Sequence, residues 1–168
     1  MKYVIAIILA FCGVAHAGQW GVQVHLHSMH FADRAFEDWN ETTGGIGLRY
    51  AFNDTYAVQV GRYRNEYTLH GHNFDSTYAL GDWLPKVYGP LRVGVYTGLV
   101  TGYPDYTMAP SMAPGRYVVT SVSHDGLYPM VGLVARADYR KFNLTLRLQP
   151  DISHAGPAHL ATEVGYSF

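Results

Sequence analysis

Hydrophobic and polar residues alternate along most of the chain with a period of two. From Trp20 to Leu26, apolar side chains alternate with glycine and polar residues, and the stretch from Phe142 to Leu148 repeats the pattern. An amphipathic helix would instead place apolar residues at positions i, i+3 and i+4, which these stretches lack. The alternation predicts eight β-strands, at residues 20–27, 46–52, 56–61, 76–83, 91–99, 128–139, 142–149 and 160–168.

The two faces of each predicted strand differ in chemistry. One face is apolar, and the other carries glycine, alanine and polar residues, which fits either a water-soluble barrel or an outer-membrane barrel with its apolar face towards lipid. The connections alternate between short turns (53–54, 82–90 and 140–141) and longer loops (31–43, 64–75, 102–127 and 150–158). Because this alternation is typical of outer-membrane proteins, we predict an all-β fold, an eight-stranded antiparallel up-and-down transmembrane β-barrel. A secreted, lipocalin-like soluble barrel is the alternative. The prolines within residues 102–127 indicate an irregular loop.

The polar faces of the predicted strands carry side chains that suit a small polar lumen. These residues are His25, His27, Arg49, Arg92, Arg147 and Glu163. An eight-stranded barrel has room only for its own side chains or one slim ligand. We therefore expect the charges of Arg49, Arg147 and Glu163 to pair and plug the lumen, which argues against a porin.

Aromatic residues fall into two groups along the predicted strands, as expected for girdles at the two membrane interfaces. The group near the short turns is Trp20, Phe52, Tyr56, Trp83, Tyr88, Tyr139, Phe142 and Phe168. The group near the long loops is Phe31, Tyr63, Tyr67, Phe74, Tyr103 and Tyr128. The general preference of tyrosine and tryptophan for strands is the alternative explanation.

Composition narrows the class of protein further. Charged residues are 15% of the chain and the formal net charge is −1, which excludes an electrostatic nucleic-acid binder. The only cysteine is Cys12, which excludes a disulfide framework and a zinc–thiolate site. Residues 1–17 have the pattern of a cleaved signal peptide, with a short apolar core and small residues at the cleavage site. Residues 18–168 then form a single outer-membrane β-barrel domain.

These observations predict the outer membrane of a diderm bacterium as the location. Phe168, on one strand face with Tyr166 and Val164, resembles the signal that the barrel assembly machinery reads. We expect that machinery, lipopolysaccharide and phospholipid as partners, and a monomeric state. No cofactor or metal is predicted, because the pair His70 and His72 is of a kind that is usually solvated on exposed loops.

The candidate catalytic residues lie at the long-loop end of the predicted barrel. A serine nucleophile needs a base within hydrogen-bond reach, and Asp75-Ser76 is expected beside His30. Glu66 lies at the same end of its strand. No G-x-S-x-G elbow is present, and composition alone favours polar loop residues that face water.

Several segments, in this order and spacing, resemble the outer-membrane lipid A palmitoyltransferase (PagP-like) family. They are residues 39–41 (Trp-Asn-Glu), 44–48 (Gly-Gly-Ile-Gly-Leu), 56–58 (Tyr-Ala-Val), 63–67 (Tyr-Arg-Asn-Glu-Tyr), 90–101 (Pro-Leu-Arg-Val-Gly-Val-Tyr-Thr-Gly-Leu-Val-Thr) and 128–131 (Tyr-Pro-Met-Val). The resemblance covers most of the chain after residue 17. It implies an eight-stranded barrel that moves a palmitoyl chain from a phospholipid to lipid A.

The resemblance also implies site residues. The histidine of the family, at the end of its first strand, corresponds to His30 or His27, and its Asp-Ser pair falls on Asn65 and Glu66, where no hydroxyl nucleophile stands. The nearest Asp-Ser pair, at residues 75–76, comes ten residues later. We therefore expect a non-channel, surface-exposed binding or structural barrel of this architecture.

An enzyme is the alternative to that expectation. A lipid acyltransferase or lipase acting on outer-leaflet lipid A or phospholipid would use His30 as base. Its nucleophile would be Ser76, or Glu66 would activate water.

Overall fold

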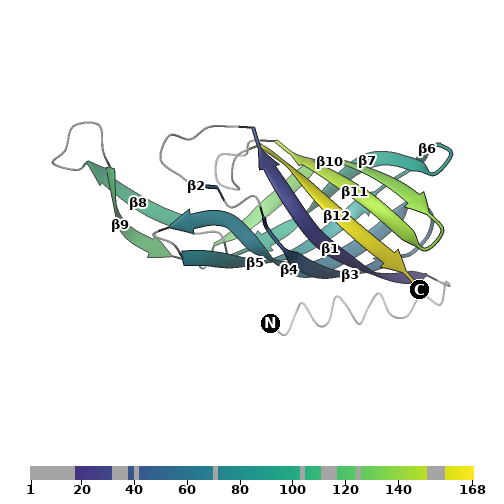
Figure 1. Cartoon of the computed structure of the whole chain (residues 1–168), viewed down its shortest axis with the longest axis horizontal. Helices are drawn as coiled ribbons and strands as arrows, with labels where there is room; N and C mark the ends of the chain where they lie inside the picture. The colour runs from purple at the N-terminus through teal and green to yellow at the C-terminus, as the bar shows by residue number, and fades with distance from the viewer. Residues whose placement is uncertain are drawn as a thin grey trace.

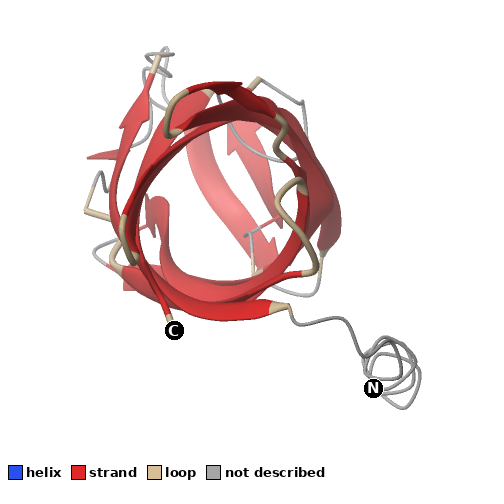
Figure 2. Ribbon diagram, turned by 90° about the vertical axis from the view of Figure 1, so that its right-hand side faces the viewer, coloured by secondary structure: helices blue, strands red, loops and turns tan. Residues whose placement is uncertain are grey.

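A computed structural model describes residues 18–31, 38–39, 42–69, 72–102, 105–110, 117–123, 126–150 and 158–168. Eight long strands form one closed antiparallel ring. In ring order they are β1 (Gln19–His30), β3 (Gly45–Ala51), β4 (Tyr56–Leu69), β5 (His72–Trp83), β7 (Leu91–Thr101), β10 (Leu127–Tyr139), β11 (Phe142–Gln149) and β12 (His159–Ser167). Pairing of β12 with β1 and of β7 with β10 closes the ring, which Figure 2 shows in a view along the barrel. The predicted fold is confirmed. Within the described residues, no helix has the length and apolar character needed to cross a membrane.

Four short strands add to the ring at its two ends. At the short-turn end, β6 (Lys86–Tyr88) pairs with β7. At the long-loop end, β2 (Asp38–Trp39) pairs with β4, and β8 (Asp105–Pro110) pairs with β9 (Tyr117–Ser123) in a separate two-stranded sheet. Figure 1 shows the β8–β9 hairpin projecting beyond the ring.

The predictions of two loops, at residues 64–75 and 102–127, are partly wrong. Residues 105–110 and 117–123 form a hairpin within the segment predicted to be irregular. Strands β4 and β5 continue to Leu69 and from His72, through the predicted loop at residues 64–75. The strands were predicted from apolar–polar alternation. A hairpin outside the membrane does not need that alternation, because its backbone hydrogen bonds form whatever its side chains are.

The faces of the strands are inverted relative to a water-soluble barrel. Outward-facing apolar residues on every part of the ring remain exposed, among them Ile46, Val60, Val95, Leu133 and Leu144. Polar residues on the other face are buried in the lumen. In water this arrangement would expose a continuous apolar belt, whereas in a bilayer the belt contacts lipid. The alternative of a soluble barrel with its apolar face inwards is wrong.

The aromatic girdle at the short-turn end is confirmed in most of its members. Side chains at this end that project outwards and remain exposed are Trp20, Tyr56, Trp83, Tyr88, Tyr139, Phe142 and Phe168. At the long-loop end, Tyr63 is buried inside the barrel and Tyr128 packs against the same core. The prediction of an outer girdle is therefore wrong for these two. The side chains of Tyr67, Phe74 and Tyr103 lie outside the described residues.

A β-bulge interrupts the alternation of β1. His25 pairs with Glu163 of β12, and the register shifts by one residue before His27. An extra residue in one strand reverses which positions face each side beyond it. His25 and Ser28 are consequently both buried, whereas His27 is exposed. The prediction that His27 faces the lumen is wrong, because a strict period of two does not reveal an inserted residue.

Candidate functional site: the lumen of the barrel

Arg147 on β11 is the centre of a polar network that crosses the lumen. Its guanidinium donates to both carboxylate oxygens of Asp82 on β5, at 2.7 and 3.1 Å, and to Glu163 on β12 at 3.1 Å. It also donates to Gln59 Oε1 at 3.2 Å and lies 5.0 Å from the centre of the Tyr96 ring. The ion pair between Arg147 and Glu163 is the pairing expected from the sequence. We call these residues, Gln59, Asp82, Arg147 and Glu163, the plug.

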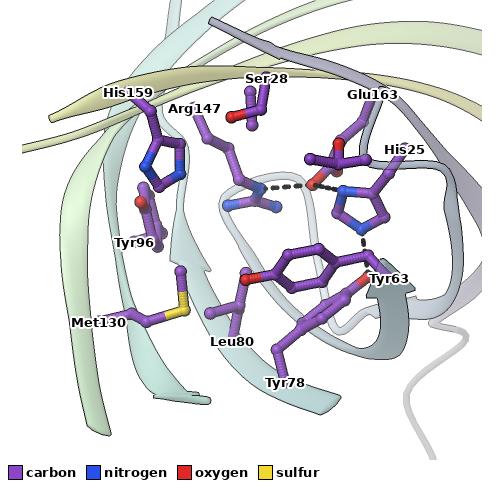
Figure 3. A pocket seen from close by; sticks show the side chains of 12 residues that line it. His25, Ser28, Tyr63, Tyr78, Leu80, Tyr96, Met130, Arg147, His159 and Glu163 are labelled. Carbon is purple, nitrogen blue, oxygen red and sulfur yellow. Dashed lines mark hydrogen bonds and ion pairs between the residues drawn. The ribbon is translucent and has the colours of Figure 1, made fainter. Parts of the chain in front are cut away.

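A second group of hydrogen bonds continues from the plug towards the long-loop end. His25 Nε2 lies 2.7 Å from the Tyr78 hydroxyl, and its Nδ1 lies 3.4 Å from Glu163 (Figure 3). Gln59 donates to the same hydroxyl at 2.8 Å and to Glu163 at 3.3 Å. Both ring nitrogens of His25 therefore face polar partners that hold its orientation.

Two glycines make this arrangement sterically feasible. A Cβ atom at Gly47 or Gly61 would collide with the Tyr78 hydroxyl. The phenol of Tyr78 lies across the space that side chains would otherwise occupy on β3 and β4. Glycine is thus required at both positions because another side chain approaches closely, rather than because of its backbone angles.

A small cavity lies beside the plug, towards the long-loop end (Figure 3). Its walls are formed by His25, Ser28, Thr43, Tyr63, Tyr78, Leu80, Tyr96, Met130, Arg147, His159, Ala161 and Glu163. The cavity has a volume of about 40 Å³, which is room for roughly three water molecules. It is far too small for a long acyl chain.

The half of the lumen nearer the short turns contains a separate ionic cluster. Asp138 accepts hydrogen bonds from Arg92 at 3.1 Å and from Arg136 at 2.7 Å. Arg92 also donates to the backbone carbonyl of Asp54. Arg49 lies 4.0 Å from the Asp82 carboxylate of the plug. Within the described residues, no group of three or more histidine, cysteine, aspartate or glutamate side chains could hold a metal ion.

The candidate catalytic residues lie on separate strands. His30 ends β1 and pairs with His159 of β12, with ring centres 5.4 Å apart. Ser76 is buried on β5, and Asp75 forms an exposed ion pair with Arg62 at 2.6 Å. Strands β3 and β4 lie between β1 and β5 in the ring. Side chains of β1 and β5 nevertheless meet across the lumen, as His25 and Tyr78 do, so the expected position of Asp75-Ser76 near His30 stays a prediction.

Other predicted residues make no catalytic arrangement that the structure describes. His27 is exposed beyond the bulge. Asn65 and Glu66 belong to β4, but their side chains lie outside the described residues. His70 also lies outside them. Of the hydroxyl groups in the cavity wall, that of Ser28 is buried and makes no hydrogen bond.

Two residues of the plug were missed as functional candidates. Asp82 lies where the predicted strand 76–83 overlaps the predicted turn 82–90, and Gln59 lies on the polar face of the predicted strand 56–61. Asp82 lies on the same strand face as Tyr78 and Leu80, because side chains two residues apart on a strand point to the same side. An acidic residue on that face could have been predicted as a lumenal partner for an arginine. Its pairing with Arg147 joins residues 65 positions apart, which alternation cannot predict.

Comparisons with known proteins agree with this architecture. No protein-family model matches the chain, and no curated protein matches it. Among solved structures, the outer-membrane protein Ail of Yersinia pestis, in a phospholipid bilayer nanodisc, superposes with a TM-score of 0.50 at 13% identity, covering 90% of this chain and 99% of Ail. Neisserial surface protein A gives a TM-score of 0.46 at 13% identity, covering 91% and 98% of the two chains. A crystal structure of Ail gives 0.40 at 11% identity, covering 90% and 97%.

The superposition on Ail supports the fold. The sequence identity of 13% is too low to assign the function of Ail to this chain. Together with the exposed apolar belt, the superposition agrees with the location predicted from the sequence. The chain has the closed eight-stranded fold of bacterial outer-membrane proteins.

Proposed function

We propose that this protein is a sealed, non-enzymatic barrel of the outer membrane that presents its hairpins as a binding surface outside the cell. The observation that carries the proposal is the plug. Arg147 and Glu163 are fully buried and bridge the lumen with Asp82 and Gln59. A lumen filled by paired charges does not conduct ions or solutes.

The extension of the barrel beyond the membrane supports the binding role. The β4–β5 and β8–β9 hairpins lie at the end opposite the short turns. Long loops of outer-membrane barrels face the cell exterior, so these hairpins would be presented there. The structural neighbour Ail is named an attachment invasion locus protein, but the proposal rests on the plug and the hairpins.

We propose lipopolysaccharide and phospholipid as the molecules around the apolar belt, and the barrel assembly machinery as the insertion partner of a monomer. An acyltransferase of PagP-like architecture is not favoured. The cavity beside the plug has a volume of about 40 Å³, and both ring nitrogens of His25 are engaged by Glu163 and Tyr78.

Conductance across planar lipid bilayers tests the sealed lumen. The wild-type protein is expected to show no conductance steps. A variant in which Arg49, Asp82, Arg147 and Glu163 are all replaced by alanine loses the crossing side chains together with every charge that pairs within this group, and it is expected to conduct. Steady conductance of the wild-type protein would refute the proposal.

Two cell-based measurements test whether the hairpins face the cell exterior and whether the protein modifies lipid A. An epitope inserted between β8 and β9 is expected to be accessible to antibody on intact cells, whereas one inserted at the 140–141 turn is expected to be protected. Lipid A mass spectra of cells with and without the gene are expected to be identical. A palmitoyl-sized increment that disappears in His30→Gln would instead establish the enzyme.

A further inference from the structure

The ionisable side chains inside the barrel do not balance. Among the described residues, four arginines and three carboxylates lie in the lumen: Arg49, Arg92, Arg136 and Arg147 against Asp82, Asp138 and Glu163. With His25 neutral, the lumen carries one uncompensated positive charge. An unpaired buried charge is strongly destabilising, since burial removes its hydration without replacing it.

The excess can be traced to one half of the lumen. Arg147 and Arg49 share Asp82 and Glu163, so the charges of that group cancel. Near the short turns, Asp138 is instead shared by two guanidinium groups, those of Arg92 and Arg136. Arg92 and Arg136 are also direct cross-strand partners on β7 and β10, and like charges in that position repel.

Two guanidinium groups retain buried donors without a hydrogen bond. They are Nη1 of Arg136 and Nε of Arg49. Arg136 is only 6% exposed, so bulk water does not solvate this donor freely. Arg49 is only 4.0 Å from Asp82, and that carboxylate already accepts two hydrogen bonds from Arg147. Buried donors of this kind normally have a partner.

The two arginines with orphaned donors lie on opposite sides of the ring. Arg49 is on β3 and Arg136 is on β10, and three strands separate them in either direction around the ring. Lumenal side chains from non-adjacent strands meet inside this narrow ring, as those of Arg147 on β11 and Asp82 on β5 do, and Arg49 lies 4.0 Å from the same Asp82. The side chain of Asp138, beside Arg136, is 31% exposed, so this half of the lumen is open to solvent from the short-turn end.

We infer that the lumen holds a small monovalent anion, such as chloride, between Arg49 and Arg136. One negative charge balances the excess of one positive charge. An anion accepts from the orphaned donors of both residues, and guanidinium groups are well suited to such charge-assisted hydrogen bonds. The plug blocks its passage further through the barrel, so the site is structural rather than part of a conduction path.

Urea unfolding in zwitterionic detergent micelles tests this inference, with chloride replacing gluconate at constant ionic strength. A ligand that binds only the folded state lowers the unfolding equilibrium constant in proportion to its concentration above the dissociation constant, about tenfold for each tenfold rise. The wild-type protein is expected to show this dependence. Arg136→Gln removes both the excess charge and one donor, so its unfolding is expected not to depend on chloride.

Arg62→Gln is the matched control, because it removes the same charge from an exposed ion pair at the other end of the barrel. It is expected to keep the chloride dependence of the wild-type protein. Indifference of the wild-type protein to the exchange of anions would overturn the inference, as would an unchanged dependence in Arg136→Gln.

Crystals of the wild-type protein grown in bromide provide a test that needs no variant. An anomalous peak between the guanidinium groups of Arg49 and Arg136 is expected. Anomalous peaks confined to the protein surface would overturn the assignment.

Discussion

Replacing Arg147 with methionine is the sharpest test of the plug. The substitution keeps an unbranched side chain of similar length but removes the guanidinium. Asp82 and Glu163 then remain with side chains that are 1% and 0% exposed and have lost their principal positive partner. The barrel wall itself is unchanged, so the effect reports on the lumenal network.

The magnitude follows from the geometry. Each carboxylate lies within hydrogen-bond distance of Arg147, and a pair of unit charges about 4 Å apart is worth about 4 kcal/mol at an effective dielectric constant near 20. Part of that gain is offset, because the arginine no longer has to be desolvated. Removing one partner from a buried ionic group costs about 3–5 kcal/mol, which raises the unfolding equilibrium constant by roughly two to three and a half powers of ten.

Reversible urea unfolding in micelles, followed by tryptophan fluorescence, measures this cost. The comparison variant combines Arg147→Met with Arg49→Gln, Asp82→Asn and Glu163→Gln, which removes all four charges of the group at once. Replacing a whole buried ionic group is often close to neutral, so the quadruple variant is expected to recover most of the lost stability. A loss below about 1 kcal/mol in the single variant, or a quadruple variant no more stable than the single one, would refute the reasoning.

Three further predictions concern the belt, the glycine contacts and the barrel end. Leu133→Arg places a charge on the lipid-facing side of β10 near its middle and is expected to cost about 2–4 kcal/mol in bilayer-based unfolding measurements. Gly61→Leu displaces the Tyr78 phenol and is expected to cost about 1–3 kcal/mol in urea unfolding. Arg62→Ala breaks the exposed ion pair with Asp75 and is expected to cost at most about 1 kcal/mol, falling further at high salt.

Each of these predictions has an outcome that contradicts it. Leu127→Arg, at the end of the same strand, is the control for Leu133→Arg, and equal costs at the two depths would argue against a membrane-spanning belt. A Gly61→Leu variant as stable as the wild-type protein would mean that Tyr78 is not held where the structure places it. A loss of several kcal/mol in Arg62→Ala would show a role beyond a surface ion pair.

Local alternation was sufficient to predict the strands of the ring, and the alternation of short turns with long loops indicated that the apolar face meets lipid. Leu144, Leu146 and Leu148 alternate with polar residues, and this period determines which side chains share a face. Alternation could not place the residues around His27, since a single inserted residue reverses the faces beyond it. It also missed the β8–β9 hairpin, because the prolines of residues 102–127 indicated an irregular loop.

The candidate site was predictable only where partners lie on adjacent strands. Arg147 and Glu163 are on neighbouring β11 and β12, and their pairing was expected from their shared polar face. The contact of Arg147 with Asp82 depends on the assembly of several strands into one curved sheet, which no local pattern encodes. His30 was placed correctly at the end of its strand, and its proximity to Ser76 stays a prediction.

The plug also has a consequence for the order in which the barrel forms. Arg147 and Glu163 are 16 residues apart, on one hairpin, so this pair can form as soon as β11 meets β12. The contacts with Asp82 and Gln59 span 65 and 88 residues and need the strands from β4 to β11 assembled into one curved sheet. The plug is therefore completed later than the Arg147–Glu163 pair. Weakening the Asp82 contact should accelerate opening of the finished barrel while leaving its rate of closure nearly unchanged.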